Sequence, residues 1–217
     1  MRKATQEEID KFVNYRANHV ALVQRIGRVV FGKDFSKHDK DKVECDAEDL
    51  NYYALRNAMQ DGRYKPLKKD KVILNNLMGR HVKSQKHHPE YWDDALTVDD
   101  FNYEEPVSVD ASKMPPLALI ELVCDWSAVA IKLNKGIFEW YNKTCTGDSP
   151  RFRFTPGQEC IIIAGLMRVQ DDLKKEKLYY PGVDYTAKKD KPILEDDLVR
   201  YIIALIDRLH SSLAIHL

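Results

Sequence analysis

Apolar residues recur at helical spacing along most of this chain, and that period limits its fold more than any other feature of the sequence. Thr5 followed by Glu8 fits a capping box, and the apolar positions after it predict one long helix over residues 6–31 that ends near Gly32. Further helices are predicted over residues 46–60, 70–85, 115–133, 136–144, 155–177 and 194–217. No alternating strand pattern of any length competes with these periods, so we expect an all-α fold.

The composition is that of an ordinary globular protein, with 44% hydrophobic and 31% charged residues in a chain of 217, the length of one domain. Lysine plus arginine and aspartate plus glutamate both number 34, so no net field attracts nucleic acid or an anionic membrane. No window reaches the roughly 18 apolar residues of a membrane span, and the N-terminus is polar where a signal peptide would be apolar. We therefore expect a cytoplasmic protein.

The four cysteines are far apart in the chain and show no CxxC pairing; they are Cys45, Cys124, Cys145 and Cys160. Cys124 and Cys160 lie in apolar helical runs, where a buried free thiol is usual. We expect neither disulfide bonds nor a zinc finger.

Histidine and acidic residues gather at a few places in the predicted helices. His19 lies in the middle of the first helix, where by itself a packed core histidine is the simpler interpretation. The pair His38-Asp39 lies in a charged stretch, residues 33–50, of the kind that usually forms a solvated loop or the start of a helix. Glu121 and Asp125 are the only acidic residues in a strongly apolar helix, and their i,i+4 spacing puts both on one face.

A histidine cluster follows the helix predicted over residues 70–85. His81, His87 and His88 fall within eight positions, although the whole chain holds only seven histidines. Imidazole and carboxylate groups hold transition metals and Mg²⁺, and catalytic sites leave positions open for water or substrate. Because neighbouring side chains on a helix point in different directions, His38 and Asp39 could reach two different ions, or one of them could bridge two.

The order of these residues resembles that of the HD-domain superfamily, in which a helical bundle supplies His, then His-Asp, further histidines and a final Asp to one or two metals. The resemblance spans about residues 15–130. Three blocks, HDKDK at 38–42, HHPEYW at 87–92 and ELVCDW at 121–126, look like the HDxSK, HHPEYW and E-x-x-x-DW signatures of a small uncharacterised HD-like family of viral and bacterial genomes. Asp41 departs from that pattern, which has serine there. Residues 33–37, KDFSK, also fit the HDxSK block except at the first position. Lys33 would then stand in place of the histidine, and lysine offers no imidazole ligand, so we align the block with His38-Asp39.

The resemblance implies an HD-type bundle over about residues 6–135 within a single domain of residues 1–217, with a helical extension over 136–217. It implies one or two divalent ions, among which Mn, Fe, Mg, Co and Zn are not distinguished. The implied ligands are His19, His38, Asp39, Asp125 and one or more of His81, His87 and His88. Lys42 would face an anionic group of the substrate, unless it is an ordinary solvated lysine. Glu121 would orient a ligand or lie near a metal-bound water.

Three functions are compatible with such a site. Most HD-domain proteins hydrolyse phosphate esters, so we expect a metal-dependent phosphohydrolase for a nucleotide or a similar small ester, with Lys42 and either Arg80 or Lys86 holding the phosphate. An HD-type di-iron oxygenase acting on a small anion is the alternative, because many imidazoles favour iron over Mg²⁺. A third possibility is a non-catalytic scaffold that binds a nucleotide or a partner. The acidic loop predicted over 92–114 and the C-terminal helix would suit a partner or a homodimer.

Overall fold

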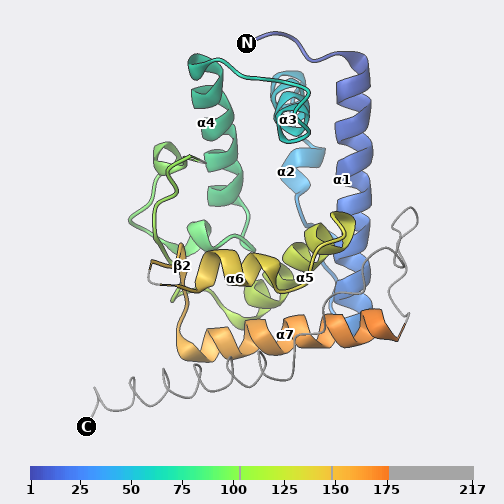
Figure 1. Ribbon diagram of the computed structural model, residues 1–217, viewed down its shortest axis with the longest axis vertical. Coiled ribbons are helices and arrows are strands. Elements are labelled where there is room, and N and C mark those ends of the chain that lie inside the picture. Colours follow the sequence, from blue (N-terminus) through green and yellow to red (C-terminus); the bar gives the residue numbers. More distant parts are fainter. Residues whose placement is uncertain (103, 148, 176–217) are drawn as a thin grey trace.

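Helices account for nearly all of the regular structure in the computed structural model, which describes residues 1–102, 104–147 and 149–175 (Figure 1). The predicted all-α class is therefore confirmed. The helix predicted over residues 194–217 lies outside the described residues. Within the described ranges, no helix is both long and apolar enough to cross a membrane.

Apart from α2, which lies in the charged stretch over residues 33–50, the observed helices follow the predicted ranges to within a few residues. The α-helices are α1 (Gln6–Ile26), α2 (Lys40–Val43), α3 (Ala47–Gln60), α4 (Lys68–Ser84), α5 (Pro116–Lys132), α6 (Glu139–Cys145) and α7 (Pro156–Lys174). The shorter elements are the π-helical turn η1 (Gly27–Phe31), the 3₁₀ turns η2 (Pro89–Trp92) and η3 (Val98–Asp100), and the strands β1 (Val109–Asp110) and β2 (Phe152–Arg153). The two strands pair in parallel, and at two residues each they are too short to leave an alternating pattern in the sequence.

Local signals set the helix ends. Thr5 and Glu8 form the predicted capping box of α1, and the Asp46 side chain accepts from a backbone N–H at the start of α3. Pro116 occupies the first turn of α5, where its missing N–H costs no hydrogen bond. The long first helix continues through η1 and stops at Gly32, whose φ of 63° lies in the left-handed region.

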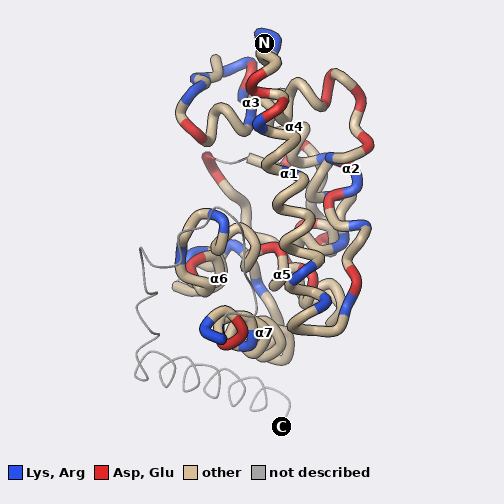
Figure 2. Tube along the Cα trace, turned by 90° about the vertical axis from the view of Figure 1, so that its right-hand side faces the viewer, with Lys and Arg blue, Asp and Glu red and all other residues tan. Residues whose placement is uncertain are grey.

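The helix α5 is the centre of the packing. It contacts α1 on one side and α7 on the other, and Leu119, Leu122 and Val123 on it are fully buried. Around it lies the larger of two apolar clusters, and the smaller one, which includes Phe12 and Leu77, lies where α1, α3 and α4 approach one another. Figure 1 shows α3 and α4 in the upper part of the molecule, α5, α6 and α7 across its lower part, and α1 running along one side from the top down to α7. The view in Figure 2, turned by 90°, again shows α3 and α4 above α5, α6 and α7. The four cysteines are all free thiols, as expected.

Candidate metal centre

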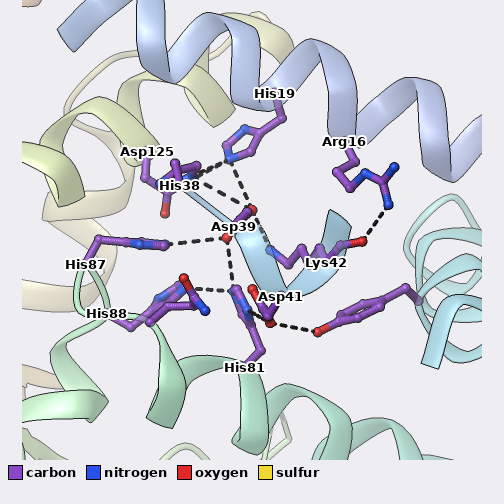
Figure 3. Close-up of polar contacts among 12 residues, drawn as sticks. Arg16, His19, His38, Asp39, Asp41, Lys42, His81, His87, His88 and Asp125 are labelled. Carbon is purple, nitrogen blue, oxygen red and sulfur yellow. Dashed lines mark hydrogen bonds and ion pairs between the residues drawn. The ribbon is translucent and has the colours of Figure 1, made fainter. Parts of the chain in front are cut away.

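The side chains that the sequence singled out meet in one place (Figure 3). They come from α1, the turn before α2, the end of α4, the turn after α4, and α5. Seven of them, five histidines and two aspartates, form two groups of potential ligand atoms: His19, His38 and Asp125 in the first, and Asp39, His81, His87 and His88 in the second. Glu121 forms a third group with His38 and His87, one histidine from each of the other two. Within each group the ligand atoms all lie within 4.8 Å of one another. Every predicted ligand is therefore part of the cluster.

The first group joins α1 to α5. His19 Nε2 lies 3.0 Å from Asp125 Oδ1 and 3.2 Å from His38 Nε2. His38 Nε2 lies 3.8 Å from the same Asp125 oxygen. His19 and His38 are 5% and 2% exposed, so water competes little for these nitrogens.

The second group surrounds Asp39 with the histidines of α4 and of the turn that follows it. Asp39 Oδ1 lies 3.4 Å from His81 Nε2 and 3.6 Å from His87 Nε2. His88 Nε2 lies 2.9 Å from His81 Nε2. These three histidines and Asp39 therefore bring four potential ligand atoms close together at a second point.

Asp39 connects the two groups. While its Oδ1 faces the second group, its Oδ2 lies 3.8 Å from His19 Nε2 and 3.9 Å from His38 Nε2. The residue has a φ of 54°, in the left-handed region that only a few per cent of non-glycine residues adopt and that aspartate enters more readily than most. This backbone turn lets two neighbouring residues, His38 and Asp39, both direct their side chains into the cluster. A carboxylate so placed can bridge two ions.

The tautomers of two ligand histidines follow from their outer contacts. His38 Nδ1 lies 3.1 Å from Glu121 Oε1, and His81 Nδ1 lies 2.8 Å from Asp41 Oδ2. A carboxylate only accepts, so each Nδ1 carries the hydrogen and donates it. In the neutral rings, the Nε2 atoms then present lone pairs to the centre of the cluster, which is the form that binds metal.

One buried oxygen of the cluster lacks a partner. The buried Asp39 Oδ1 has no hydrogen-bond partner among the described residues, and such an oxygen is costly. His81 Nε2 and His88 Nε2, 2.9 Å apart, form an ordinary hydrogen bond when one of the two nitrogens carries the hydrogen. A divalent cation would give Asp39 Oδ1 its missing partner, and the imidazoles and carboxylates of both groups are ligands that such ions take.

Glu121 serves both groups at once. Besides its contact with His38, its Oε1 lies 3.5 Å from Nδ1 of His87, which belongs to the second group. The sequence predicted an orienting role for Glu121 but not this double contact. It missed the matching role of Asp41, which holds His81 and accepts a hydrogen bond from the Tyr53 hydroxyl at 3.3 Å. The only signal was that Asp41 replaces the serine of the related HDxSK block.

The protonation states suit metal binding. Burial, reinforced by Lys42 beside His81 and by neighbouring histidines beside the other two, lowers the pKa of His81, His87 and His88, so these rings are neutral. Burial raises the pKa of Asp39, but Lys42 and the surrounding histidines outweigh burial and hold it well below its ordinary value. His38 differs: burial lowers its pKa, but Asp39, Glu121 and Asp125 outweigh burial and raise it. Neutral imidazoles and ionised carboxylates are the forms that a metal requires, so an ion bound at His38 would displace a proton.

The rest of the HHPEYW block holds the turn that carries His87 and His88. Lys83 Nζ donates to the backbone oxygens of Glu90 at 3.0 Å and Asp93 at 2.9 Å. Arg151, beside strand β2, donates to Glu90 Oε1 at 2.8 Å, and Trp92 Nε1 donates to the backbone oxygen of Lys86 at 2.8 Å. Sequence reasoning missed Arg151, because nothing in its local pattern points to a partner 61 residues away.

The three predicted phosphate-binding cations lie in different places. Lys42 Nζ lies 2.8 Å from Asp39 Oδ2, at the edge of the cluster. Arg80 is paired with Asp49 through two hydrogen bonds, of 3.0 and 2.7 Å, on the exposed side of α4. Lys86 is also exposed. Of the three, only Lys42 lines the cavity beside the ligands.

That cavity has a volume of about 240 Å³ and reaches ligands of both groups, including His19, Asp39, His81, His88 and Asp125. The remaining wall is formed by aromatic, amide and guanidinium side chains of α1 and α3 and by residues near α5, α6 and β2. The potential ions would therefore be accessible to a small molecule.

Fold and site together define an all-α protein with a buried histidine and aspartate cluster that could hold metal ions. The chain belongs to a family of unknown function, DUF5662, whose model matches residues 8–163. The matched range contains every ligand of the cluster as well as Glu121 and Arg151. No curated protein and no solved structure matches the chain.

Proposed function

We propose that the protein is a metal-dependent phosphohydrolase of the HD type that acts on a small phosphate ester, nucleotides included. The observation that carries this proposal is the position of Asp39, whose two oxygens face two separate groups of histidines at the edge of a cavity. Resemblance to the HD-domain superfamily adds support by analogy, because the ligands occur in its chain order.

Each part of the site has a role in such a reaction. Bound divalent ions would lower the pKa of water from about 15.7 to roughly 7 and offset the charge of phosphoryl oxygens. Asp39, Asp125 and the five histidines would hold the ions, while Glu121 and Asp41 fix the orientation of the rings. Lys42, at the cavity wall, would bind a phosphoryl oxygen.

Metal analysis followed by a phosphate-release screen tests the proposal. We expect up to two divalent ions per purified chain, and phosphate release from some nucleotides or phosphomonoesters when Mn²⁺, Mg²⁺, Fe²⁺, Co²⁺ or Zn²⁺ is supplied. Asp39→Asn should abolish release, whereas Arg28→Gln, which changes an exposed arginine paired with Asp34, should not. A chain that binds no divalent ion under any of these conditions contradicts the proposal.

A di-iron oxygenase is the second candidate, because five imidazoles surround the site and imidazole-rich sites favour iron over Mg²⁺. It would show two irons per chain and oxygen consumption with a small anionic compound, without release of phosphate. Binding of a nucleotide with neither phosphate release nor oxygen consumption would instead indicate the non-catalytic scaffold.

A further inference from the structure

Two helix faces look onto the cavity away from the metal ligands. Their cavity-lining residues occur at positions i, i+3, i+4 and i+7: Phe12, Tyr15, Arg16 and His19 on α1, and Tyr53, Arg56, Asn57 and Gln60 on α3. This spacing places each set on one side of its helix, and α1 and α3 pack against each other. Only His19 among the eight is a potential metal ligand, so the other side chains form a separate wall.

Asn57 adds an amide to this wall. The residue is 8% exposed and lines the cavity, and no hydrogen bond among the described residues involves its side-chain amide. Its amide atoms are not among the buried atoms that lack a partner, so they reach the water of the cavity. A ligand in the cavity can take the place of that water and form a hydrogen bond with the amide.

Arg16 adds a positive charge close by. Its guanidinium donates to the backbone oxygen of Lys42, and in Figure 3 it lies on the far side of Lys42 from the metal ligands. Within the described part of the chain, no carboxylate forms an ion pair with Arg16, whereas Lys42 and Arg151, two other cations of the cavity, are paired with Asp39 and Glu90. Most of the five N–H donors of Arg16 remain available to a ligand.

Arg56 brings a second guanidinium to the same wall, one position before Asn57 on α3. Burial lowers its pKa to about 10, which still leaves it charged at neutral pH. The wall therefore combines two cations and an amide, and guanidinium groups match the geometry of carboxylate and phosphate oxygens.

We propose that this wall is a second anion-binding subsite, and that the substrate carries two anionic groups. One group would reach the metal ligands, and the other would be held by Arg16 and Arg56 while Asn57 donates a hydrogen bond to it. The inference rests on the function proposed for the metal site, and it narrows the substrate to a small molecule with a phosphoryl group and a second carboxylate or phosphate. The helical rise between Arg16 and His19 is about 4.5 Å, which calls for a short spacer between the two anions.

Calorimetric titration of the Mn²⁺-loaded full-length chain tests this. The probes are inorganic phosphate, which has one anionic centre, and the series phosphonoacetate, 3-phosphonopropionate and 4-phosphonobutyrate, which carry a carboxylate at increasing distance. We expect at least one member of the series to bind about tenfold more tightly than phosphate, because charge-assisted hydrogen bonds to a second anion add affinity.

Three variants test whether the wall causes the tighter binding of the phosphonocarboxylates. Arg16→Gln should bind them no more tightly than phosphate and leave the affinity for phosphate within about twofold. Arg16→Lys, which keeps the charge, should retain part of the preference for the phosphonocarboxylates. Asn57→Asp should lower the affinity for the phosphonocarboxylates below that of the unaltered protein, because it places a negative charge beside the carboxylate of the ligand. Arg28→Gln is the matched control, since Arg28 lies on the exposed side of η1 and pairs with Asp34; it should behave as the unaltered protein does.

The outcomes separate this inference from the proposed function. If phosphate binds but no phosphonocarboxylate binds more tightly, or if Arg16→Gln keeps the preference for the phosphonocarboxylates, the second subsite is wrong and the metal-site proposal stands. If neither phosphate nor the series binds the Mn²⁺-loaded chain, the proposed function itself fails. Circular dichroism of each variant shows that the helices are retained, and the phosphate affinity shows that the metal cluster is intact.

Discussion

Replacing Glu121 should weaken both potential metal sites at once. Its Oε1 accepts from Nδ1 of His38 at 3.1 Å and lies 3.5 Å from Nδ1 of His87, and these two histidines belong to different ligand groups. Loss of one carboxylate that orients a ligand histidine typically costs about 10- to 100-fold in metal affinity, or about 1.4–2.8 kcal/mol.

The choice of substitution sets the size of the effect. Glu121→Gln keeps an acceptor oxygen but removes the charge, so we expect a loss of about tenfold at each site, the low end of that range. Glu121→Ala also removes the acceptor and should approach about 100-fold at each site. Asp41→Asn is the matched control, because Asp41 contacts only His81 of the second group and should weaken one site alone.

Competition between the protein and a fluorescent chelator for Zn²⁺ or Mn²⁺ measures the two dissociation constants separately. Glu121 does not hold both histidines if Glu121→Gln has the same affinity for both ions as the unaltered chain. The same conclusion follows if Glu121→Gln lowers the affinity at one site only, as Asp41→Asn should. A fall in helix content would show instead that Glu121 supports the fold, and far-ultraviolet circular dichroism measures this directly.

Further predictions concern the shared ligand, the packing and the effect of pH. Asp39→Ala should lose both ions and keep its helical circular dichroism; retention of a full metal complement would show that Asp39 is not shared. Gly79→Ala should lower the free energy of unfolding by about 1–3 kcal/mol in urea titration, because an added Cβ would lie 2.2 Å from the backbone oxygen of Val98. Gly157→Ala, whose Cβ would meet no atom within 4 Å, is the control and should cause no loss. The metal-free protein should become less stable as pH falls below about 6.5, because burial lowers the pKa of His81, His87 and His88 in the folded state, so these three bind protons preferentially in the unfolded chain. The raised pKa of His38 opposes this effect at one site. His88→Gln should flatten that decline in thermal melts, and an unchanged slope would contradict the assignment.

Helix positions were decided by short-range chemistry, which is why the sequence alone predicted them. The capping box of Thr5 and Glu8 and the Asp46 cap each act over three residues, and Pro116 acts within a single turn. The apolar period likewise identifies which face of each helix is buried without reference to the rest of the chain. The residues of the histidine and aspartate cluster were predicted in the same way, from residue type, local clustering and their order along the chain.

How the residues of the cluster contact one another was decided by the tertiary structure. That Asp39 faces both groups depends on a backbone with a φ of 54°, and that Glu121 contacts two histidines depends on how α5 packs against segments 83 and 34 residues away in the chain. Arg16 and Asn57 share a cavity only because α1 and α3 lie side by side. Contacts between residues so far apart leave no periodic trace in the sequence, because they arise only when the apolar faces of the helices pack together.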